Sequence, residues 1–412
     1  MTIAYYRHIS ERALLERGTC WRGRRSLQLV GGAAEPWPWP WLGVVSMSRA
    51  MMVSSDNGAS GGLAAGMSVL EAGGSALDAV EAACRVVEAD LAESSVGRAG
   101  VPNALGEVRL DAQIMDGETL QAGSVGAVRN CCHVITLARH VMEGTPHVMI
   151  VGDGAEHLAR ELGLDDAHPG GATPLLTPDA DALWRAALRK QFGDDIDLDD
   201  PTAAWRGSAD ERYPPLREWA ELLRPRPVLP EHWFGTVNFM ATDQQGRIAT
   251  GVSTSGWGWS YPGRLGDTPV IGAGSYADSR YGAAAATGTG EVTIRTAAAR
   301  SVVLYMKIGM SVQSAVREAM ADMRDLRDPY VAHINLIAMD AEGNHAGCSY
   351  RPDKMYCVMR SGETEITMLP HENPHPWHKG AKGWLLYKHQ KGSGGGGGFA
   401  TRSDDNTPTA RL

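Results

Sequence analysis

The sequence predicts an α+β fold in which helices are stacked on antiparallel sheets. Helical and strand patterns occur in blocks instead of in strict alternation, which is typical of layered helix-on-sheet folds. Two late hairpins also repeat one another, since VNFMATDQQG from Val237 and INLIAMDAEG from Ile334 follow the same pattern. Such a repeat indicates neighbouring antiparallel strands in one sheet.

Length and composition exclude several classes of protein. The chain has 412 residues, of which 43% are hydrophobic and 21% charged, so it can bury a sizeable core. Its formal net charge is −9 and its basic residues are scattered, which argues against nucleic-acid and membrane-surface partners. No apolar run approaches the roughly 20 residues of a membrane-spanning helix. Six cysteines are too few for a disulfide scaffold, although one Cys348–Cys357 bridge stays open.

Residues 1–50 differ in character from the rest. The pair Arg24-Arg25 is typical of a twin-arginine export signal, but Glu35 and the Trp-Pro alternation over 36–41 replace the apolar segment that such a signal needs. We therefore expect an extension that is either disordered or absent from the mature protein. A cytoplasmic location is favoured, and export is the alternative.

The next part of the chain predicts helices and one hairpin. Ser75 and Asp78 form a capping-box pattern ahead of apolar residues at helical spacing. The dipeptide Asp116-Gly117 is a strong turn signal between two strand-like runs. The expected elements are a helix from 75 to about 88, strands 108–115 and 121–125, a helix 131–142, a strand 147–151 and a helix 155–162.

Regular patterns fade over residues 165–235 and then return abruptly. A connection of this length inside a domain is unusual and tends to be functional or cleaved. We therefore expect a single domain whose two parts, 51–235 and 236–370, are joined by this linker. The second part is predicted to contain hairpins at 236–253 and 334–349, helices 296–307 and 312–323, and then a flexible tail at 371–412.

Two patterns suggest a metal site, and neither holds. The alternating acids Asp195, Asp197 and Asp199 lack the glycine and the final glutamate of a calcium loop. The histidines His371, His375 and His378 lie among prolines, which forbid the helix that would bring them onto one face. No metal and no cofactor is predicted.

The glycine-rich segment Ser253–Gly290 concentrates the unusual residues. Arg264 and Asp267, three positions apart, would suit the carboxylate and the ammonium of an α-amino acid, while the alternative is a surface pair that braces a turn. Residues 272–277 also match a dinucleotide fingerprint, with Glu291 as its ribose-binding acid. That oxidoreductase alternative is weak, because it requires a helix directly after the glycines.

Taken in order, these blocks resemble the glycosylasparaginase and isoaspartyl peptidase (plant-type asparaginase) family of N-terminal nucleophile hydrolases. The resemblance rests on GGSALDAVEAAC, SVGRAGVPNALGEVRLDAQIMDG, GTVNFMATDQQGRIATGVSTSG, PGRLGDTPVIGAGSYAD and GAAAATGTGE, and covers roughly 52–163 and 235–349. It implies a four-layer αββα sandwich made as an inactive precursor. The precursor then cuts itself between Gly235 and Thr236, and processed units pair as a homodimer.

The resemblance also implies the roles of the site residues. Thr236 would be the nucleophile and Thr254 a supporting hydroxyl. Arg264 would bind the substrate carboxylate and Asp267 its ammonium. The remaining pair, Thr287 and Gly288, would surround the scissile carbonyl, with Thr254 or the Gly288 N–H contributing to the oxyanion hole.

Elementary chemistry explains why such a cut would activate the threonine. A threonine hydroxyl is a poor nucleophile without a neighbouring base, and inside a chain the nitrogen of Thr236 is an amide. Freed as an α-amine, that nitrogen has a pKa near 8 and can accept the hydroxyl proton. Without the family motifs, Thr236 would be interpreted as an ordinary strand threonine.

Two positions depart from the glycosylasparaginase pattern. That branch carries aspartate before the nucleophile, where this chain has Gly235, and a tryptophan beside the substrate, where this chain has Asp56. The sequence therefore predicts an amidohydrolase that acts on a small-molecule asparagine derivative, with N4-(β-N-acetylglucosaminyl)-L-asparagine favoured. The alternatives are an isoaspartyl dipeptidase or L-asparaginase of the same family, and an uncut, non-catalytic amino-acid binder.

Overall fold

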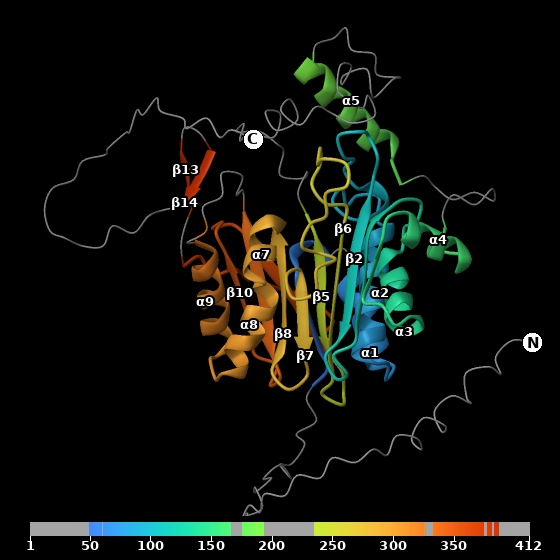
Figure 1. Cartoon of the computed structure of the whole chain (residues 1–412). Helices are drawn as coiled ribbons and strands as arrows, with labels where there is room; N and C mark the ends of the chain where they lie inside the picture. Colours follow the sequence, from blue (N-terminus) through green and yellow to red (C-terminus); the bar gives the residue numbers. More distant parts are fainter. Residues whose placement is uncertain are drawn as a thin grey trace, which may run out of the picture. The chain divides into compact units, whose positions relative to one another are not determined.

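Two β-sheets and their flanking helices account for most of the chain in this computed structural model (Figure 1). The structure describes residues 49–59, 61–165, 175–192, 235–324, 326, 333–374, 377–380 and 383–386. The helices are η1 (Asp56–Ala59), α1 (Gly62–Glu71), α2 (Ala76–Ala89), η2 (Gly97–Ala99), α3 (Val134–Gly144), α4 (Asp153–Glu161), α5 (Pro178–Phe192), α7 (Gly290–Thr296), α8 (Ala298–Lys307) and α9 (Val312–Arg324).

The larger sheet has eight strands in the order β12-β11-β1-β5-β6-β2-β3-β4. All neighbours in it are antiparallel except β3 and β4. Its strands are β1 (Met51–Ser55), β2 (Leu110–Asp116), β3 (Ala122–Val128), β4 (Met149–Val151), β5 (Val237–Thr242), β6 (Ile248–Thr254), β11 (Met355–Arg360) and β12 (Thr367–Pro370).

The smaller sheet has four antiparallel strands in the order β10-β9-β8-β7. These strands are β7 (Ser275–Asp278), β8 (Gly282–Gly288), β9 (Ile334–Asp340) and β10 (His345–Ser349). A separate pair, β13 (Trp377–Gly380) and β14 (Gly383–Leu386), lies in the segment predicted as a tail.

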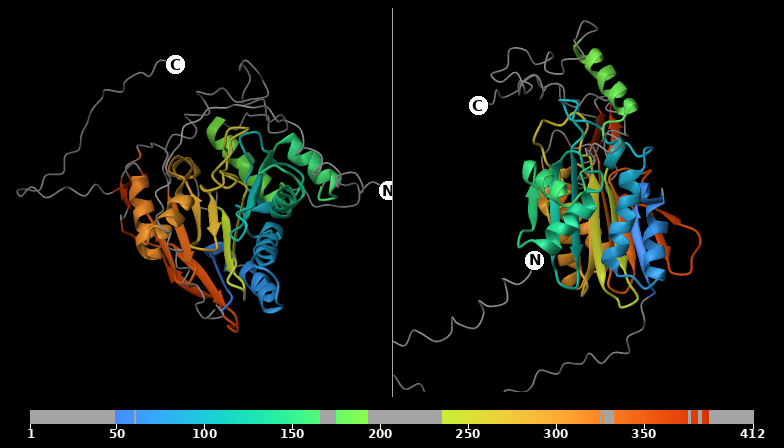
Figure 2. Two further views of the ribbon diagram at one scale, coloured as in Figure 1. Left: turned by 60° about the horizontal axis from the view of Figure 1, so that its bottom comes forward. Right: turned by 90° about the vertical axis from the view of Figure 1, so that its right-hand side faces the viewer.

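Three apolar clusters hold the elements together. One joins α1, α2 and α3 to the larger sheet, and includes Leu63, Val80 and Ile135. A second lies between the two sheets, where Met240 of β5 and Ile337 of β9 are buried. The third joins α8 and α9 to the smaller sheet. Figure 2 shows the consequence, with the sheets face to face and helices on both outer sides.

Several sequence predictions are confirmed. The Ser75 side chain accepts a hydrogen bond from the Asp78 N–H and the reciprocal bond is present, so α2 begins at the predicted capping box. The hairpin of β2 and β3 turns at Asp116-Gly117. Both late hairpins form, and α8 and α9 are separated at Gly309, whose φ of +99° suits glycine.

The prediction that the two similar hairpins share one sheet is wrong. The hairpin of β5 and β6 lies in the larger sheet, whereas that of β9 and β10 lies in the smaller one. Their apolar faces meet in the cluster between the sheets. The similar sequence patterns therefore indicate that each hairpin buries one face between the sheets. They do not indicate that the two hairpins pair with each other.

Other differences concern segments with little periodicity. The glycine-rich segment, interpreted as a loop, contains β7 and β8, and β1, α1, β11 and β12 were not predicted. A strand instead of a helix follows Gly274, so the dinucleotide alternative loses its required context. Cys348 and Cys357 are both free and lie in different sheets. The export-signal residues, the alternating acids Asp195–Asp199 and His375 lie outside the described residues.

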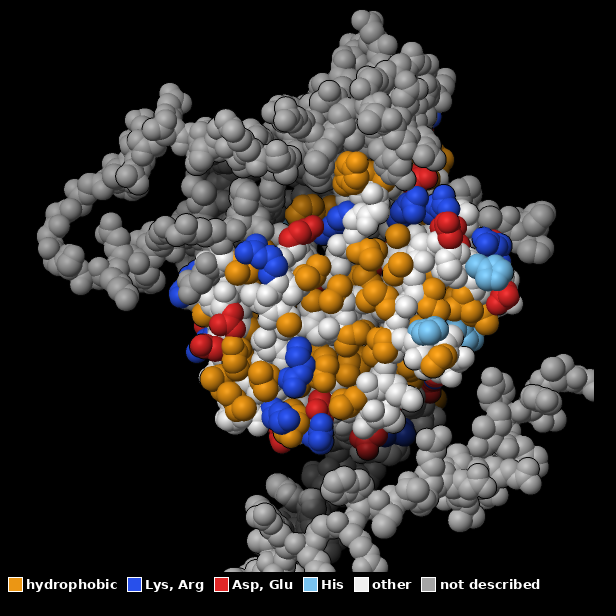
Figure 3. All heavy atoms as spheres, in the orientation of Figure 1, with side chains coloured by type: hydrophobic (Ala, Val, Ile, Leu, Met, Phe, Trp, Pro, Cys, Tyr) orange, Lys and Arg blue, Asp and Glu red, His pale blue; other side chains and the backbone are white. Residues whose placement is uncertain are grey.

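In the view of Figure 3, apolar side chains are spread over the middle of the described surface, and most of the charged side chains lie around them. The exposed apolar residues of α7, α8 and the turn after α8 include Ile294, Leu304 and Ile308. Within the described ranges, no helix is both long and apolar enough to cross a membrane.

Candidate active site

Thr236 lies directly before β5 and beside the end of β6. Its hydroxyl oxygen is 3.3 Å from that of Thr254 and 2.8 Å from the carbonyl oxygen of Gly235. The Thr254 hydroxyl donates to the same carbonyl at 2.7 Å. The register of the two strands, in which Val237 pairs with Ser253, brings these groups together. Two hydroxyls thus converge on the carbonyl of the peptide bond that precedes Thr236.

The direction of the Thr254 hydrogen bond is fixed by the backbone. The Gly256 N–H donates to the Thr254 hydroxyl oxygen at 3.0 Å, and an N–H can only donate. A carbonyl oxygen can only accept, so the single hydroxyl hydrogen of Thr254 is directed to the Gly235 carbonyl. This geometry polarises that carbonyl and would stabilise negative charge on its oxygen.

Close packing explains why glycine precedes Thr236. A Cβ atom at Gly235 would lie 2.0 Å from the hydroxyl oxygen of Ser95 and 2.4 Å from its Cβ. Ser95 is held in turn by Glu93, whose carboxylate accepts its hydroxyl hydrogen at 2.5 Å. An aspartate, the residue of the glycosylasparaginase branch, has no room at position 235 in this arrangement.

Arg264 and Asp267 lie in the loop between β6 and β7. The Arg264 guanidinium donates through Nε and Nη2 to the two carboxylate oxygens of Glu291, both at 3.0 Å, and lies 4.8 Å from the centre of the Trp257 ring. Asp267 is buried and accepts from the Thr293 hydroxyl at 2.9 Å. The predicted cation and anion are adjacent, but Glu291 already engages the guanidinium, which the sequence did not predict.

Asp111 adds a second buried acid to this region. It pairs with Thr254 across β2 and β6, and accepts from the Ala127 N–H at 2.8 Å. Burial raises the pKa of Asp111 and that of Asp267 to about 6 in each case, against the opposing effect of Arg264. A pocket of ≈ 320 Å³, here called the Arg264 pocket, is lined by Asp111, Ser255, Arg264 and neighbouring residues.

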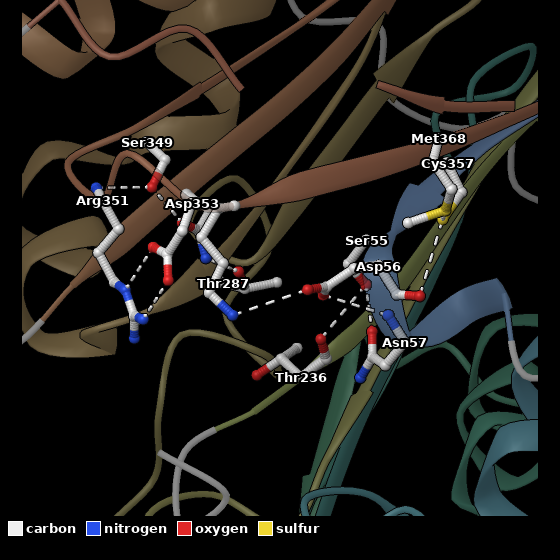
Figure 4. A network of polar contacts seen from close by, with 12 residues as sticks. Ser55, Asp56, Asn57, Thr236, Thr287, Ser349, Arg351, Asp353, Cys357 and Met368 are labelled. Carbon is white, nitrogen blue, oxygen red and sulfur yellow. Dashed lines mark hydrogen bonds and ion pairs between the residues drawn. The ribbon is translucent and has the colours of Figure 1, made fainter. Parts of the chain in front are cut away.

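Thr287 and Gly288 end β8 on the opposing sheet. A second pocket of ≈ 210 Å³, here called the Thr287 pocket, is lined by Ser55, Asp56, Asn238, Thr287, Asn335, Ile337, Met355 and His371. The Ser55 hydroxyl lies 3.4 Å from the Thr236 carbonyl oxygen, which connects this pocket to Thr236 (Figure 4). Gly288 has a φ of +113°, and a Cβ atom there would lie 2.2 Å from the backbone oxygen of His333.

The wall of the Thr287 pocket is polar. Asp56 lies there, with Lys354 Nζ at 3.6 Å from its carboxylate. Asn238 is buried, and its amide nitrogen has no hydrogen-bond partner among the described residues. His371, one of the three histidines of the rejected metal pattern, is buried in the same wall. Burial lowers the pKa of its ring to about 4, so the ring is neutral at higher pH. Asp56, which the family resemblance aligns with a tryptophan, is thus part of this polar wall.

The predicted residues come from both sheets. Thr254 ends β6 beside Thr236, and Arg264 lines its own pocket, whereas Thr287 and Gly288 end β8 in the smaller sheet. Sequence reasoning missed Asp111 and Asn335, although a charged residue inside an otherwise apolar strand such as LDAQIMD is a usable signal for the first. In the part of the chain that is described, no three His, Cys, Asp or Glu side chains are placed to hold a metal ion.

Comparisons with known proteins show which proteins the chain is similar to. The model of a family described as asparaginase matches residues 45–369. The chain is 35% identical over 298 residues to an N(4)-(beta-N-acetylglucosaminyl)-L-asparaginase of Elizabethkingia miricola, which covers 70% of this chain and 73% of the relative. It is 34% identical to a plant-type L-asparaginase of Pyrococcus horikoshii (71% and 86% covered) and 33% identical to an isoaspartyl peptidase/L-asparaginase of Danio rerio (64% and 73%).

Proposed function

Because this chain belongs to the asparaginase family, we propose that it is a self-cleaving amidohydrolase that hydrolyses the side-chain amide of asparagine derivatives. The observation that carries the proposal is the convergence of the Thr236 and Thr254 hydroxyls on the Gly235 carbonyl. The fold that we propose with it is the four-layer αββα sandwich of N-terminal nucleophile hydrolases, supported by the order of the three apolar clusters.

Self-cleavage would begin with attack of the Thr236 hydroxyl oxygen on the Gly235 carbonyl carbon. The negative charge that develops on the carbonyl oxygen is stabilised by the Thr254 hydroxyl, which already donates to it. The Thr236 nitrogen takes a proton and leaves, and the resulting ester is hydrolysed by water. Scission therefore converts the amide nitrogen of Thr236 into the α-amine that serves as base in later turnovers.

Turnover would use the same nucleophile on a bound substrate. Arg264 binds the α-carboxylate and Asp267 the α-ammonium, so Glu291 must share the guanidinium with the substrate. Thr287 and Gly288 lie around the scissile carbonyl, with Thr254 or the Gly288 N–H in the oxyanion hole. Attack gives a β-aspartyl ester on Thr236, and water then releases aspartate.

The leaving group distinguishes three candidate substrates. N4-(β-N-acetylglucosaminyl)-L-asparagine is favoured by the activity that the Elizabethkingia relative is named for. A β-aspartyl dipeptide, or asparagine itself, is favoured by Asp56 on the pocket wall and by the absence of room for an aspartate at Gly235. Turnover rates on the three compounds, measured side by side, distinguish these candidates.

A denaturing gel tests the proposal most directly. Cleavage before Thr236 gives fragments of 235 and 412 − 235 = 177 residues, the smaller of which begins with threonine. We expect two bands for the natural chain, and one band without hydrolysis for Thr236→Ala. A single band from fully active natural protein would refute the mechanism. A single band from protein that only binds aspartate would favour the non-catalytic alternative.

A further inference from the structure

Three side chains form a hydrogen-bonded row across the smaller sheet. Asn335 of β9 pairs with Thr287 on β8 and with Ser349 on β10, so the three side chains lie on one face. The Asn335 amide nitrogen is 2.8 Å from the Thr287 hydroxyl oxygen, and its amide oxygen is 2.6 Å from the Ser349 hydroxyl. Figure 4 shows Thr287 at the Thr236 end of this row and Ser349 at the far end.

A backbone group sets the direction of the whole row. The Arg351 N–H donates to the Ser349 hydroxyl oxygen at 2.9 Å and can only donate. The Ser349 hydrogen is then available for the Asn335 amide oxygen. That contact assigns the amide nitrogen of Asn335 to the Thr287 side, where it donates. The Thr287 oxygen is thereby occupied as an acceptor, and its hydrogen remains.

Thr287 lies in the wall of the Thr287 pocket, where its remaining hydrogen is available to a ligand. Thr287 and Asn335 both line that pocket, and only 8% of Thr287 is exposed. Among the hydrogen bonds of the described residues, the Thr287 hydroxyl accepts from Asn335 and donates none. A buried hydroxyl that lacks a protein acceptor is ready to donate to a ligand oxygen.

We propose that Asn335 and Ser349 are positioning residues that hold the Thr287 hydroxyl as a donor toward a carboxyl or amide oxygen of the substrate. The proposal rests on the proposed function, in which that oxygen is the β-carbonyl of the aspartyl group. Neither residue touches the substrate in this account. They act through Thr287. The Asn335 amide donates to its oxygen, so the Thr287 hydrogen is directed to the substrate instead.

Substitution of Asn335 by aspartate would reverse the row. An ionised carboxylate only accepts, so the Thr287 hydrogen would turn to it and away from the substrate. We expect kcat to fall about 100-fold, near the lower end for loss of one oxyanion donor. Asn335→Leu removes the partner without recapturing the hydrogen, so a smaller loss is expected. Ser349→Thr keeps the hydroxyl that bonds to Asn335 and Ser349→Ala removes it, so the first variant should lose less activity than the second.

The pH dependence separates this role from a merely structural one. A protonated aspartate at position 335 can donate to Thr287 and accept from Ser349, as asparagine does. The ratio of the Asn335→Asp activity to the natural activity should therefore rise as the pH falls from 8 to 5. A constant ratio, or Asn335→Leu being as damaging as Asn335→Asp, would overturn the proposal.

Binding of L-aspartate keeps this test independent of turnover. Calorimetry on the same variants reports whether the β-carboxylate of aspartate gains from the Thr287 donor, even in protein that does not hydrolyse any amide. We expect Asn335→Asp to weaken this binding more than Asn335→Leu. Equal weakening would contradict the positioning role, whereas failure of the proposed function would show as intact binding of aspartate without two bands on the gel.

Discussion

Two threonine hydroxyls, Thr254 of the larger sheet and Thr287 of the smaller one, are held by different means. Two backbone groups hold the Thr254 hydroxyl, since the Gly256 N–H donates to it and the Gly235 carbonyl accepts from it. The Thr287 hydroxyl is instead held by the side chain of Asn335, which Ser349 holds in turn. Substitution at other positions cannot easily alter a backbone donor, but it can alter a row of side chains.

The two pockets differ in electrostatics as well. Asp111 and Asp267, in and beside the Arg264 pocket, have pKa values raised to about 6 by burial, so they change charge near that pH. His371 in the Thr287 pocket has a pKa lowered to about 4, also by burial, and stays neutral above it. Between about pH 4 and 6, titration of these three buried groups alters only the side that would hold the amino-acid head group.

The largest expected effect tests whether Thr254 and Thr287 have separate roles in self-cleavage. Thr254→Val removes the donor to the Gly235 carbonyl, so we expect self-cleavage to slow about 100- to 1,000-fold. Thr287→Val leaves that carbonyl contact untouched and should give two fragments at the natural rate, with slowed turnover. Time courses on denaturing gels, with Thr254→Ser as control, measure the difference. Equal processing defects in both valine variants would show that the two roles are not separate.

A smaller effect concerns the fit around the proposed cleavage site. Gly235→Ala places a Cβ against Ser95, and the strain should shift the carbonyl away from Thr254 and slow self-cleavage roughly tenfold or more. Ser95→Gly in the same chain removes the obstruction, so the double variant should process faster than Gly235→Ala alone. Absence of any such rescue would mean that glycine is required for its backbone freedom and not for space.

Local signals explain which elements the sequence could predict. The helix after Ser75 and the turn at Asp116-Gly117 depend on neighbouring residues, so they were found. The sheet assignment of the two similar hairpins was not, because both carry one apolar face and only tertiary packing decides that these faces meet. The glycine-rich segment hid β7 and β8 for a related reason, since the alanines of β8 have little strand preference of their own.

The site shows the same division. Thr236, Arg264 and Asp267 could be proposed from motifs that are contiguous in the chain. Asn335 could not, because it reaches Thr287 across 48 residues and Ser349 across 14, and only the register of β8, β9 and β10 aligns them. Register is a property of the folded sheet, and a shift by one residue would turn Asn335 to the other face.

The smallest expected effect concerns the ionisation of Asp267 and its influence on the stability of the folded protein. Asp267 has a folded pKa raised from its usual 3.8 to about 6, so its ionisation destabilises the folded state as the pH rises through about 6. That rise corresponds to at most about 3 kcal/mol. Asp267→Asn should therefore melt at a higher temperature than the natural protein at pH 8, with the difference vanishing near pH 4.

The same variant should also bind an α-amino acid less tightly, because the Asp267 carboxylate is proposed to attract the ammonium. Protonation of Asp267 below about pH 6 removes its attraction for an ammonium, so the natural protein should bind L-aspartate about tenfold more weakly at pH 5 than at pH 7. Asp267→Asn should bind weakly at both values. If the affinity of the natural protein for L-aspartate does not change between pH 5 and pH 7, the ammonium binds elsewhere. Asp267 would then be a buried acid with a structural role only, through its hydrogen bond to Thr293.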